Sequence, residues 1–303
     1  MSDLVITEGA SRAVITTTGA GLREFAVDGA PYVETFGEGE DPPLGAGCVL
    51  VPWPNRTAGA RWHLDGELQE LDVTEPARGN AIHGLVRRAQ WTVAETTPSS
   101  ASLECVIEPE AGWPVRLLTT ITYALEEASS DGPGLTVTHG VRNDGDRVIP
   151  FGVGVHPYPR AGHAATDDCE LRLSASTVLP LDPDQMVPTG PATPVAGTEY
   201  DFHIPRPIRG LDLDTPFGGC TPGPDGLVRH SVIAPGGGRI DIWADPDFRW
   251  VQVFTPDQFP GRGRAIAIEP MTCPPDALNS GTDLITLAPG QSWSARWGLQ
   301  PVR

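Results

Sequence analysis

The sequence predicts an all-β protein, built as a large antiparallel sandwich or barrel with few short helices. Short segments of alternating apolar and polar residues recur along the chain, and turn residues separate them at short intervals. No segment longer than about ten residues keeps apolar residues at helical spacing. The 35 Gly and 32 Pro are spread through all 303 residues, which is typical of many short strands joined by tight turns.

The first half of the chain supplies the clearest hairpin. The pair Asp65-Gly66 is a strong signal for a two-residue turn, because both residues tolerate the left-handed backbone that such turns require. Alternating segments flank it directly and continue on both sides. The strands expected in this half are 14–18, 22–27, 61–64, 67–71, 91–95, 103–107 and 115–123.

The second half continues the pattern around another turn. Residues 143–146, Asn-Asp-Gly-Asp, lie between two apolar segments and predict a tight connection. The strands expected here are 135–143, 147–155, 231–234, 239–243, 250–254, 265–268 and 292–297.

We expect one domain over residues 1–303. The length allows one large all-β domain or two ordinary ones, and no linker or internal repeat is visible. The segment from Pro180 to Gly226 is dense in Pro, Asp and Gly. It is interpreted as long loops of a single domain, with a domain boundary as the alternative.

The charged residues exclude several classes of function. The formal net charge is −18 and the isoelectric point about 4.6, so nucleic acid and membrane surfaces are not expected partners. All 21 basic residues are Arg. The absence of Lys excludes mechanisms that need its amine, such as Schiff-base aldolases, pyridoxal phosphate enzymes, P-loop ATPases and protein kinases. No dinucleotide-binding glycine motif is present, and no cofactor is expected.

The start of the chain and its cysteines predict a cytoplasmic protein. Asp3 stands where a signal peptide would carry a basic residue, and no apolar run approaches the length of a membrane span. The five cysteines are odd in number, widely scattered and never in a CxxC spacing. Reduced thiols therefore fit better than a disulfide framework or a zinc cluster.

Glu269 is the first candidate for chemistry. Apolar residues lead up to it, and a loop rich in Pro, Asn, Ser and Gly follows at once. This pattern predicts a buried strand that delivers one carboxylate to its end, where a rigid framework can hold a catalytic base. The alternative is a strand that ends in a charged residue before a polar turn.

His156 repeats this arrangement after the apolar segment 151–155, with Pro157 directly behind it. Histidine titrates near neutrality, so it is a natural acid partner for a carboxylate base. The alternative is a histidine at a strand end that packs against Tyr158. If His156 stays protonated, which a nearby carboxylate favours, it can act as the acid.

Two loops add polar candidates. Asn55-Arg56 lies in a loop rigid with Pro and Gly, which can aim the fixed donors of a guanidinium. His83-Gly84 lies in a second loop and can donate or accept at a ligand. The alternatives are a surface arginine and a turn histidine.

The acidic segment 211–217 contains Asp212 and Asp214, either of which can face a ligand; a solvated loop is the alternative.

No metal site is expected, because His156 has no HxxxH or HxH partner and the other histidines are scattered. A serine nucleophile elbow is also absent. The remaining set suits proton transfer on a polar, uncharged ligand.

In these motifs the sequence resembles the aldose 1-epimerase (galactose mutarotase) family, over nearly the whole chain. Each motif is weak alone, but their order is specific. The resemblance implies a large β-sandwich of antiparallel sheets, in line with the expected strands. It rests on Asn55-Arg56 with Gly59, His83-Gly84 with Arg87 or Arg88 and Trp91, His156-Pro157-Tyr158, Glu269-Pro270-Met271-Thr272, 275–281 and 287–292.

The resemblance implies a mutarotase that interconverts the anomers of a free aldohexose such as glucose or galactose. Glu269 would be the general base for the anomeric hydroxyl, and His156 the general acid for the ring oxygen. Arg56 and His83 would bind sugar hydroxyls, with Asn55 and Tyr158 also at the site. The resemblance favours Asp214 over Asp212 as the sugar-binding acid, because Phe217 follows it by three residues.

The partner implied is a small sugar, bound by a monomer or homodimer. Pro159 stands where the family often has Phe, which leaves the preferred sugar open. One alternative is an epimerase of a hexose 6-phosphate or sulfonated sugar, with Arg87, Arg88 and Arg160 as the anion site. Another is a non-catalytic sugar-binding module on the same fold. A glycoside hydrolase would typically need two carboxylates.

Overall fold

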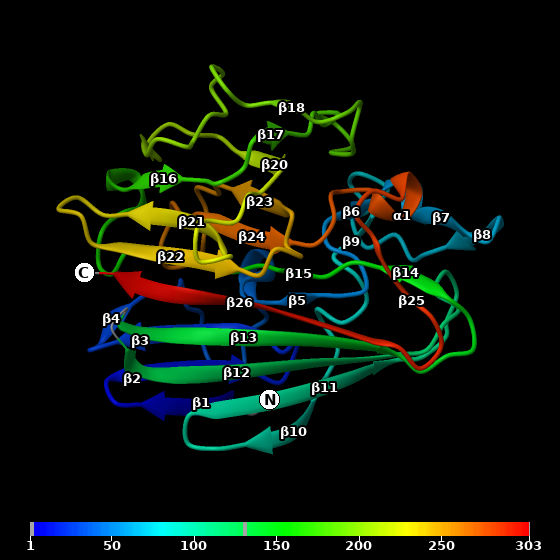
Figure 1. The fold of residues 1–303 in the computed structure, drawn as a ribbon, viewed down its shortest axis with the longest axis horizontal. Helices are drawn as coiled ribbons and strands as arrows, with labels where there is room; N and C mark the ends of the chain where they lie inside the picture. The colour runs from blue at the N-terminus through cyan, green and yellow to red at the C-terminus, as the bar shows by residue number, and fades with distance from the viewer. Residues whose placement is uncertain (1–2, 130–131, 303) are drawn as a thin grey trace.

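Nearly every regular element is a β-strand in the computed structural model, which describes residues 3–129 and 132–302 (Figure 1). Within these ranges the helical elements are one α-helix and three single 3-10 turns: α1 (Ala277–Ser280), η1 (Pro43–Gly45), η2 (Ala58–Ala60) and η3 (Thr166–Asp168). The all-β prediction is confirmed, and so is the expectation of few short helices.

The largest sheet has nine antiparallel strands, and Figure 1 shows it rising from β10 at the lower edge to β16 near the top. The long central strands come from chain segments rich in Val, Leu, Thr and aromatic residues, which fit a pleated surface that is buried on one side. In spatial order the strands are β10 (Thr92–Thr96), β11 (Ser100–Ile107), β12 (Leu117–Ser129), β13 (Gly132–Asn143), β26 (Ser292–Val302), β22 (Arg239–Ala244), β21 (Val228–Ile233), β16 (Glu170–Arg172) and β19 (Arg206–Pro207).

A second antiparallel sheet of seven strands carries most of the polar candidates. Its strands are short, and both of its edges are two-residue strands. In spatial order they are β18 (Thr193–Pro194), β17 (Thr177–Val178), β20 (Asp214–Gly218), β23 (Trp250–Phe254), β24 (Ala267–Met271), β15 (Gly154–Val155) and β5 (Val49–Leu50).

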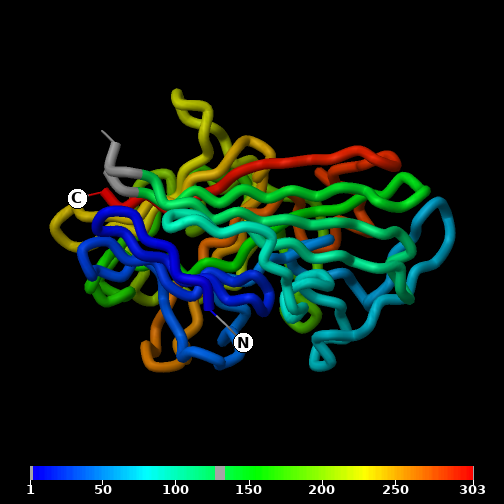
Figure 2. Tube along the Cα trace, turned by 90° about the horizontal axis from the view of Figure 1, so that it is seen from below, coloured from blue at the N-terminus to red at the C-terminus, as the bar shows by residue number. Residues whose placement is uncertain are grey.

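Four smaller sheets surround these two. The N-terminal four-stranded sheet, dark blue in Figure 2, lies with β1 and β2 against β11 and β12. The predicted Asp65-Gly66 hairpin is present as β7 and β8. The strands are β1 (Asp3–Glu8), β2 (Ser11–Thr16), β3 (Leu22–Val27) and β4 (Ala30–Pro31); β6 (Arg56–Thr57) with β9 (Ala81–Ile82); β7 (Arg61–Leu64) with β8 (Glu67–Glu70); and β14 (Ile149–Phe151) with β25 (Ile285–Leu287).

Apolar side chains of both large sheets meet in one core. Ile121 and Val137 of the nine-stranded sheet and Val251 and Ile268 of the seven-stranded sheet belong to the same buried cluster. Burying one such side chain contributes roughly 1.5–3 kcal/mol, so this shared layer holds the two sheets together. The arrangement is the sandwich that the sequence patterns favoured.

Strands β23 and β24 are buried on both faces, which positions the polar candidates. Val251 and Val253 turn toward the core, and side chains alternate faces along a strand. Gln252 therefore turns to the opposite face, and it lies directly across from Glu269 in the register of β23 and β24. One face of the sheet thus builds the core, and the other face presents polar groups.

Two predicted boundaries were wrong. Glu269 does not end its strand, because β24 runs two residues further to Met271. The segment predicted as one strand over 147–155 is two strands, β14 and β15, separated by Gly152 and Val153. The chain changes partner there: β14 pairs with β25, whereas β15 pairs with β24 and β5.

The segment from Pro180 to Gly226 is mostly loop, but it contributes three strands. β18 and β20 join the seven-stranded sheet, and β19 joins the nine-stranded sheet. Asp214, expected in a loop, is the first residue of β20. The segment therefore contributes strands to both large sheets.

Candidate active site

A cavity of about 380 Å³ opens on the polar face of β23 and β24. Its walls come from the seven-stranded sheet, from the β6 and β9 loops, and from the segment around η1. It brings together six of the seven site residues predicted from the sequence: Asn55, Arg56, His83, His156, Asp214 and Glu269.

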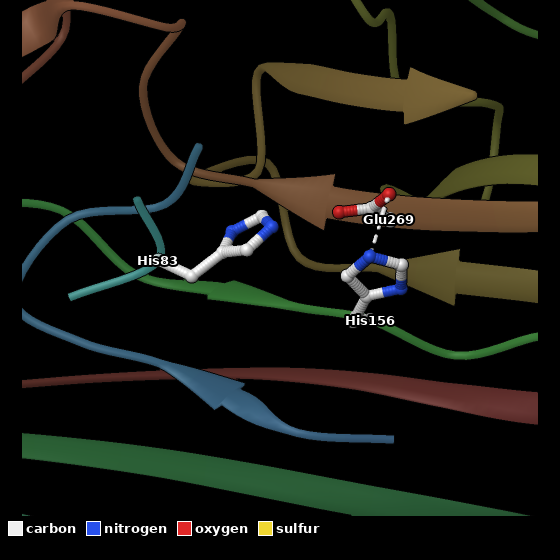
Figure 3. Close-up of side chains that lie close together, drawn as sticks. All are labelled: His83, His156 and Glu269. Carbon is white, nitrogen blue, oxygen red and sulfur yellow. Dashed lines mark ion pairs between the residues drawn. The ribbon is translucent and has the colours of Figure 1, made fainter. Parts of the chain in front are cut away.

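Glu269 and His156 both line this cavity, and Figure 3 shows their side chains pointing toward each other. The Nε2 atom of His156 lies 3.4 Å from the Oε1 atom of Glu269, and the two residues are only 4% and 1% exposed. The neighbouring strands fix both backbones: Ile268 N–H donates to Pro157 O at 3.2 Å, and Gly47 N–H donates to His156 O at 2.8 Å. The two groups thus lie on rigid elements within reach of one ligand.

Tyr158 lies behind His156 and is absent from the described lining of the cavity. Its ring stacks on the imidazole with centroids 5.2 Å apart and an interplanar angle of 22°. Its hydroxyl donates to Leu44 O at 3.2 Å. The geometry therefore suits a residue that supports His156 better than one that touches a ligand.

His83 enters from the opposite side, at the end of β9. The ring Nδ1 of His83 accepts a hydrogen bond from the backbone N–H of Asn55 at 3.2 Å, and the backbone N–H of His83 donates to Asn55 O at 2.9 Å. A neutral ring whose Nδ1 accepts carries its proton on Nε2, which leaves an N–H for a ligand. Asn55 has a left-handed backbone with φ of 55°, and its Oδ1 caps the N–H of Arg56 at 2.9 Å.

Arg56 forms an ion pair with Glu75, a carboxylate that the sequence analysis did not identify. Its Nε and Nη2 donate to the two oxygens of Glu75 at 2.9 and 3.0 Å, a bidentate pair that fixes the guanidinium plane. The Nη2 atom also lies 3.6 Å from Oδ2 of Asp214. The loop after Glu269 supports this position, because Asp276 N–H donates to Arg56 O at 2.7 Å.

Asp214 is oriented by a second residue that the sequence analysis missed. Nε2 of Gln252 donates to Oδ1 of Asp214 at 2.6 Å. The Oε1 atom of Gln252 is buried and has no partner among the described residues, although Gln252 lines the cavity. The sequence does carry one signal for Gln252, because it is a polar residue inside the otherwise apolar strand 250–254. Asp212, the alternative acid, is exposed and is not part of the lining.

Burial shifts the pKa values of the central pair in opposite directions. It raises the pKa of Glu269 well above the usual range, and the nearby Asp214 adds to this effect while Arg56 opposes it. Burial lowers the pKa of His156 to about 3 and that of His83 well below its usual range. Burial therefore disfavours the charged form of both groups, whereas a nearby carboxylate would favour a protonated His156, so its role as the acid stays a prediction.

The pair holds one proton in either arrangement. In one arrangement a protonated carboxyl lies beside a neutral imidazole, and in the other a carboxylate lies beside an imidazolium. The two differ only by the transfer of one proton between groups 3.4 Å apart. While the pair holds one proton, one member is a donor and the other an acceptor, which is what acid–base catalysis on two oxygens requires.

The same three side chains form a possible metal-ligand set. Ligand atoms of His83, His156 and Glu269 lie within 4.8 Å of one another, although their spacing in the sequence gave no such indication. Two imidazoles and a carboxylate are a donor set that divalent transition metals accept. The expectation that no metal takes part stays a prediction.

A buried histidine and carboxylate in a polar cavity on a β-sandwich define a candidate enzyme site for a small polar ligand. Comparison with known proteins gives the particular family. The family model described as Aldose 1-epimerase matches residues 2–300. The chain belongs to the aldose 1-epimerase family, a family of isomerases that act on carbohydrates.

Individual relatives agree with this assignment. The chain is 31% identical over 285 residues to the uncharacterized protein YihR of Escherichia coli K12, covering 93% of this chain and 88% of that one. It is 30% identical over 165 residues to human galactose mutarotase, covering 52% of this chain and only 45% of that one.

Solved structures show the same fold. A putative aldose 1-epimerase from Escherichia coli K12 superposes with a TM-score of 0.83 at 22% identity and covers 99% of both chains. The GalM/aldose epimerase homologue from C. elegans reaches 0.86 at 17% identity, covering 100% of this chain and 99% of that one. The β-sandwich of the galactose mutarotase type is thus confirmed.

Proposed function

We propose that this protein is a mutarotase that interconverts the α and β anomers of a free aldohexose such as glucose or galactose. The observation that carries the proposal is the buried pair of Glu269 and His156, which lie 3.4 Å apart and open onto a cavity of about 380 Å³. Polar groups that suit sugar hydroxyls surround the pair.

In the proposed reaction, the pair reacts as a Glu269 carboxylate beside a protonated His156. Glu269 takes the proton of the anomeric hydroxyl, and His156 gives its proton to the ring oxygen. The bond between the anomeric carbon and the ring oxygen breaks, and an aldehyde and a free hydroxyl form. Rotation of the aldehyde and closure by the reverse steps give the other anomer. Ring opening ends with a protonated Glu269 and a neutral His156, the arrangement that burial favours. The two transfers need no cofactor.

The surrounding residues are proposed to bind the sugar. The Nε2–H of His83 and the Nη atoms of Arg56 can donate to its hydroxyls, and Asp214 and the free Oε1 of Gln252 can accept from them. Asn55 and Tyr158 would act mainly by holding His83 and His156 in place.

The test is polarimetry on freshly dissolved α-D-glucose and α-D-galactose. The proposal predicts that the purified protein speeds the change in optical rotation at micromolar concentration, far above buffer alone. No acceleration with either sugar at any accessible protein concentration would contradict it.

A second candidate, an epimerase of a hexose 6-phosphate or sulfonated sugar, is favoured by two arginines. Arg87 and Arg88 line the cavity, and neither forms an ion pair among the described residues. Burial and the neighbouring Arg88 both lower the pKa of Arg87, so a bound anion would relieve this repulsion. Arg160 instead pairs with Glu34 at 3.2 Å.

The two candidates differ in one measurement. The second predicts a higher kcat/KM for glucose 6-phosphate than for glucose, and a loss of that preference in Arg87→Gln. An unchanged preference in this variant would exclude Arg87 as the anion contact.

We also propose a cytoplasmic location. All five cysteines are free and four are buried, which supports a reducing compartment. Within residues 3–129 and 132–302, no helix has the length and apolarity needed to cross a membrane.

A further inference from the structure

Glu34 is a buried carboxylate beside the segment that follows His156. Its side chain is only 3% exposed, and it is not part of the described lining of the cavity. Two guanidinium groups hold it: Nη1 of Arg160 donates to Oε2 at 3.2 Å, and Nε of Arg262 donates to Oε1 at 3.1 Å. Moving a charge out of water is costly, so this carboxylate depends on both partners.

The backbone of Glu34 is joined to the same segment. Its N–H donates to Tyr158 O at 2.8 Å, and Arg160 N–H donates to Tyr32 O at 2.9 Å. These bonds pair residues 32–34 with residues 158–160 in antiparallel fashion. Glu34 is therefore fixed, by its backbone and its side chain, to the residues that directly follow His156.

Arg262 connects Glu34 to the ring of Tyr158. It lies in a tight turn that is closed by two hydrogen bonds of 2.8 Å between Phe259 and Gly263. Phe259 packs against Tyr158, with ring centroids 4.9 Å apart. The ion pair of Arg262 with Glu34 therefore holds this turn, and with it the ring of Phe259, against Tyr158.

Tyr158 contacts the imidazole of His156 directly, with ring centroids 5.2 Å apart and an interplanar angle of 22°. Tyr158 and Phe259 belong to a small apolar cluster that is separate from the core shared by the two large sheets. The packing of this cluster therefore depends on the contacts between its own segments, and the ion pairs of Glu34 join two of them.

We propose that Glu34 is a positioning residue for His156. Through Arg262 and the turn that carries it, Glu34 holds Tyr158 against one face of the imidazole. The inference rests on the proposed mutarotase function.

The role differs from general stabilisation, because a loose Tyr158 would let the imidazole of His156 turn and let water reach it. A turned ring transfers its proton more slowly. Water would also remove part of the burial that lowers the pKa of His156 to about 3. The test variants leave unchanged the other titratable and charged groups around this ring, which are Glu269, His83, Arg87, Tyr158 and Cys48.

The test variant is Arg262→Gln, which removes one ion pair of Glu34 and leaves the pair with Arg160. We expect kcat on glucose to fall about tenfold with KM within about twofold, because no residue of the cavity lining changes. The acid limb of kcat/KM should move up by about one pH unit. Arg262→Lys keeps the charge and should restore most of kcat. Glu34→Asp, too short to keep both pairs, is a second variant with the same expected effects.

The matched control is Arg239→Gln. Arg239 also pairs with a buried carboxylate, that of Asp241 at 2.9 Å, on strand β22 away from the cavity. Both Arg262→Gln and Arg239→Gln should lower the urea midpoint, because each leaves a buried carboxylate with one partner fewer. Only Arg262→Gln should lower kcat and move the acid limb.

An NMR titration of the His156 ring tests the positioning role without any reaction. We expect its midpoint to lie about one pH unit higher in Arg262→Gln than in the unaltered protein. Variants at Arg262 and Glu34 that lose stability but keep kcat, the acid limb and this midpoint would overturn the positioning role and leave the mutarotase function standing. No acceleration of any sugar by the unaltered protein would contradict the proposed function, and the NMR midpoint would still decide the role of Glu34.

Discussion

Nε2 of His156 lies 3.4 Å from Oε1 of Glu269, and both side chains are buried in the wall of one cavity. Burial disfavours the charged form of each group, because it raises the pKa of Glu269 and lowers that of His156. The distance is slightly longer than an ordinary hydrogen bond, so the two groups are close enough to contact one ligand that lies beside them in the cavity.

The first prediction concerns the pH dependence of activity. Because the pKa of His156 is lowered to about 3 and that of Glu269 is raised, the pair holds one proton over a wide range. Activity falls in acid when His156 takes a second proton, and in alkali when Glu269 loses the shared one. We expect kcat/KM to hold on the acid side down to about pH 4, and the alkaline limb to lie above the ordinary range of a carboxyl group.

Polarimetry across this range, with circular dichroism at each pH as the control for folding, measures the profile. An acid limb centred at about 6.5, the ordinary pKa of imidazole, would show that His156 is not held neutral.

The second prediction concerns Glu75. Glu75→Gln keeps the size of the side chain but removes the charge that pairs with Arg56. The guanidinium of Arg56 then loses its fixed orientation. We expect KM to rise about tenfold with little change in kcat, as when a uniform binding contact is weakened.

The matched control is Glu70→Gln. Glu70 pairs with Arg61, but these side chains are 62% and 65% exposed, and such pairs contribute little. A KM that changes equally in both variants, or in neither, would remove the special role of Glu75.

The third prediction concerns Gln252. Gln252→Leu deletes the amide that donates to Asp214 at 2.6 Å, together with a buried oxygen that has no partner among the described residues. We expect kcat/KM to fall about ten- to hundredfold, because Asp214 loses its orientation. The thermal midpoint should hold or rise, since an unsatisfied buried polar atom is removed.

Gln69→Leu serves as the control, on the hairpin strand β8 away from the cavity. A loss of activity in Gln252→Leu that only follows a loss of stability would contradict the orienting role.

The sequence predicted which residues meet at the candidate site better than it predicted the ends of their strands. His156 and Glu269 stood out because each follows an apolar run, and the structure brings them together. The strand end at Glu269 was wrong because Pro270 was taken as a stop. In β24, pairing with β15 is limited to Met271 and Gly154, so that neighbour requires no hydrogen bond from Pro270.

Other site residues carried little or no local signal. Glu75 is one of 39 acidic residues and lies 19 positions from Arg56, so only the folded chain reveals their pairing. Gln252 was visible only as a polar residue in an apolar strand. Its role depends on the register that sets it opposite Glu269, and register across strands is not encoded in local patterns.

The fourth prediction concerns stability beside the site. Gly47 has φ of +72°, and a Cβ there would lie 2.2 Å from the carbonyl oxygen of Leu22, so the backbone must shift. We expect Gly47→Ala to lower the free energy of unfolding by about 2–4 kcal/mol in urea titrations.

The control is Gly29→Ala, with φ of +76° and no atom within 4 Å of the added Cβ. Gly29→Ala carries the same cost of about 1–2 kcal/mol for a left-handed backbone with a side chain, but no steric clash. If the free energy of unfolding falls equally in the two variants, the close contact with Leu22 adds nothing to the cost of Gly47→Ala.

The most direct test of the central claim is the anomerisation rate of Glu269→Gln on fresh α-D-glucose and α-D-galactose, beside the unaltered protein. Glutamine fills the same space but cannot take a proton, so we expect the rate to fall about 10²–10⁴-fold while the urea unfolding transition stays cooperative. A folded variant that keeps a rate within about threefold of the unaltered protein would contradict the claim that the pair of Glu269 and His156 carries the reaction.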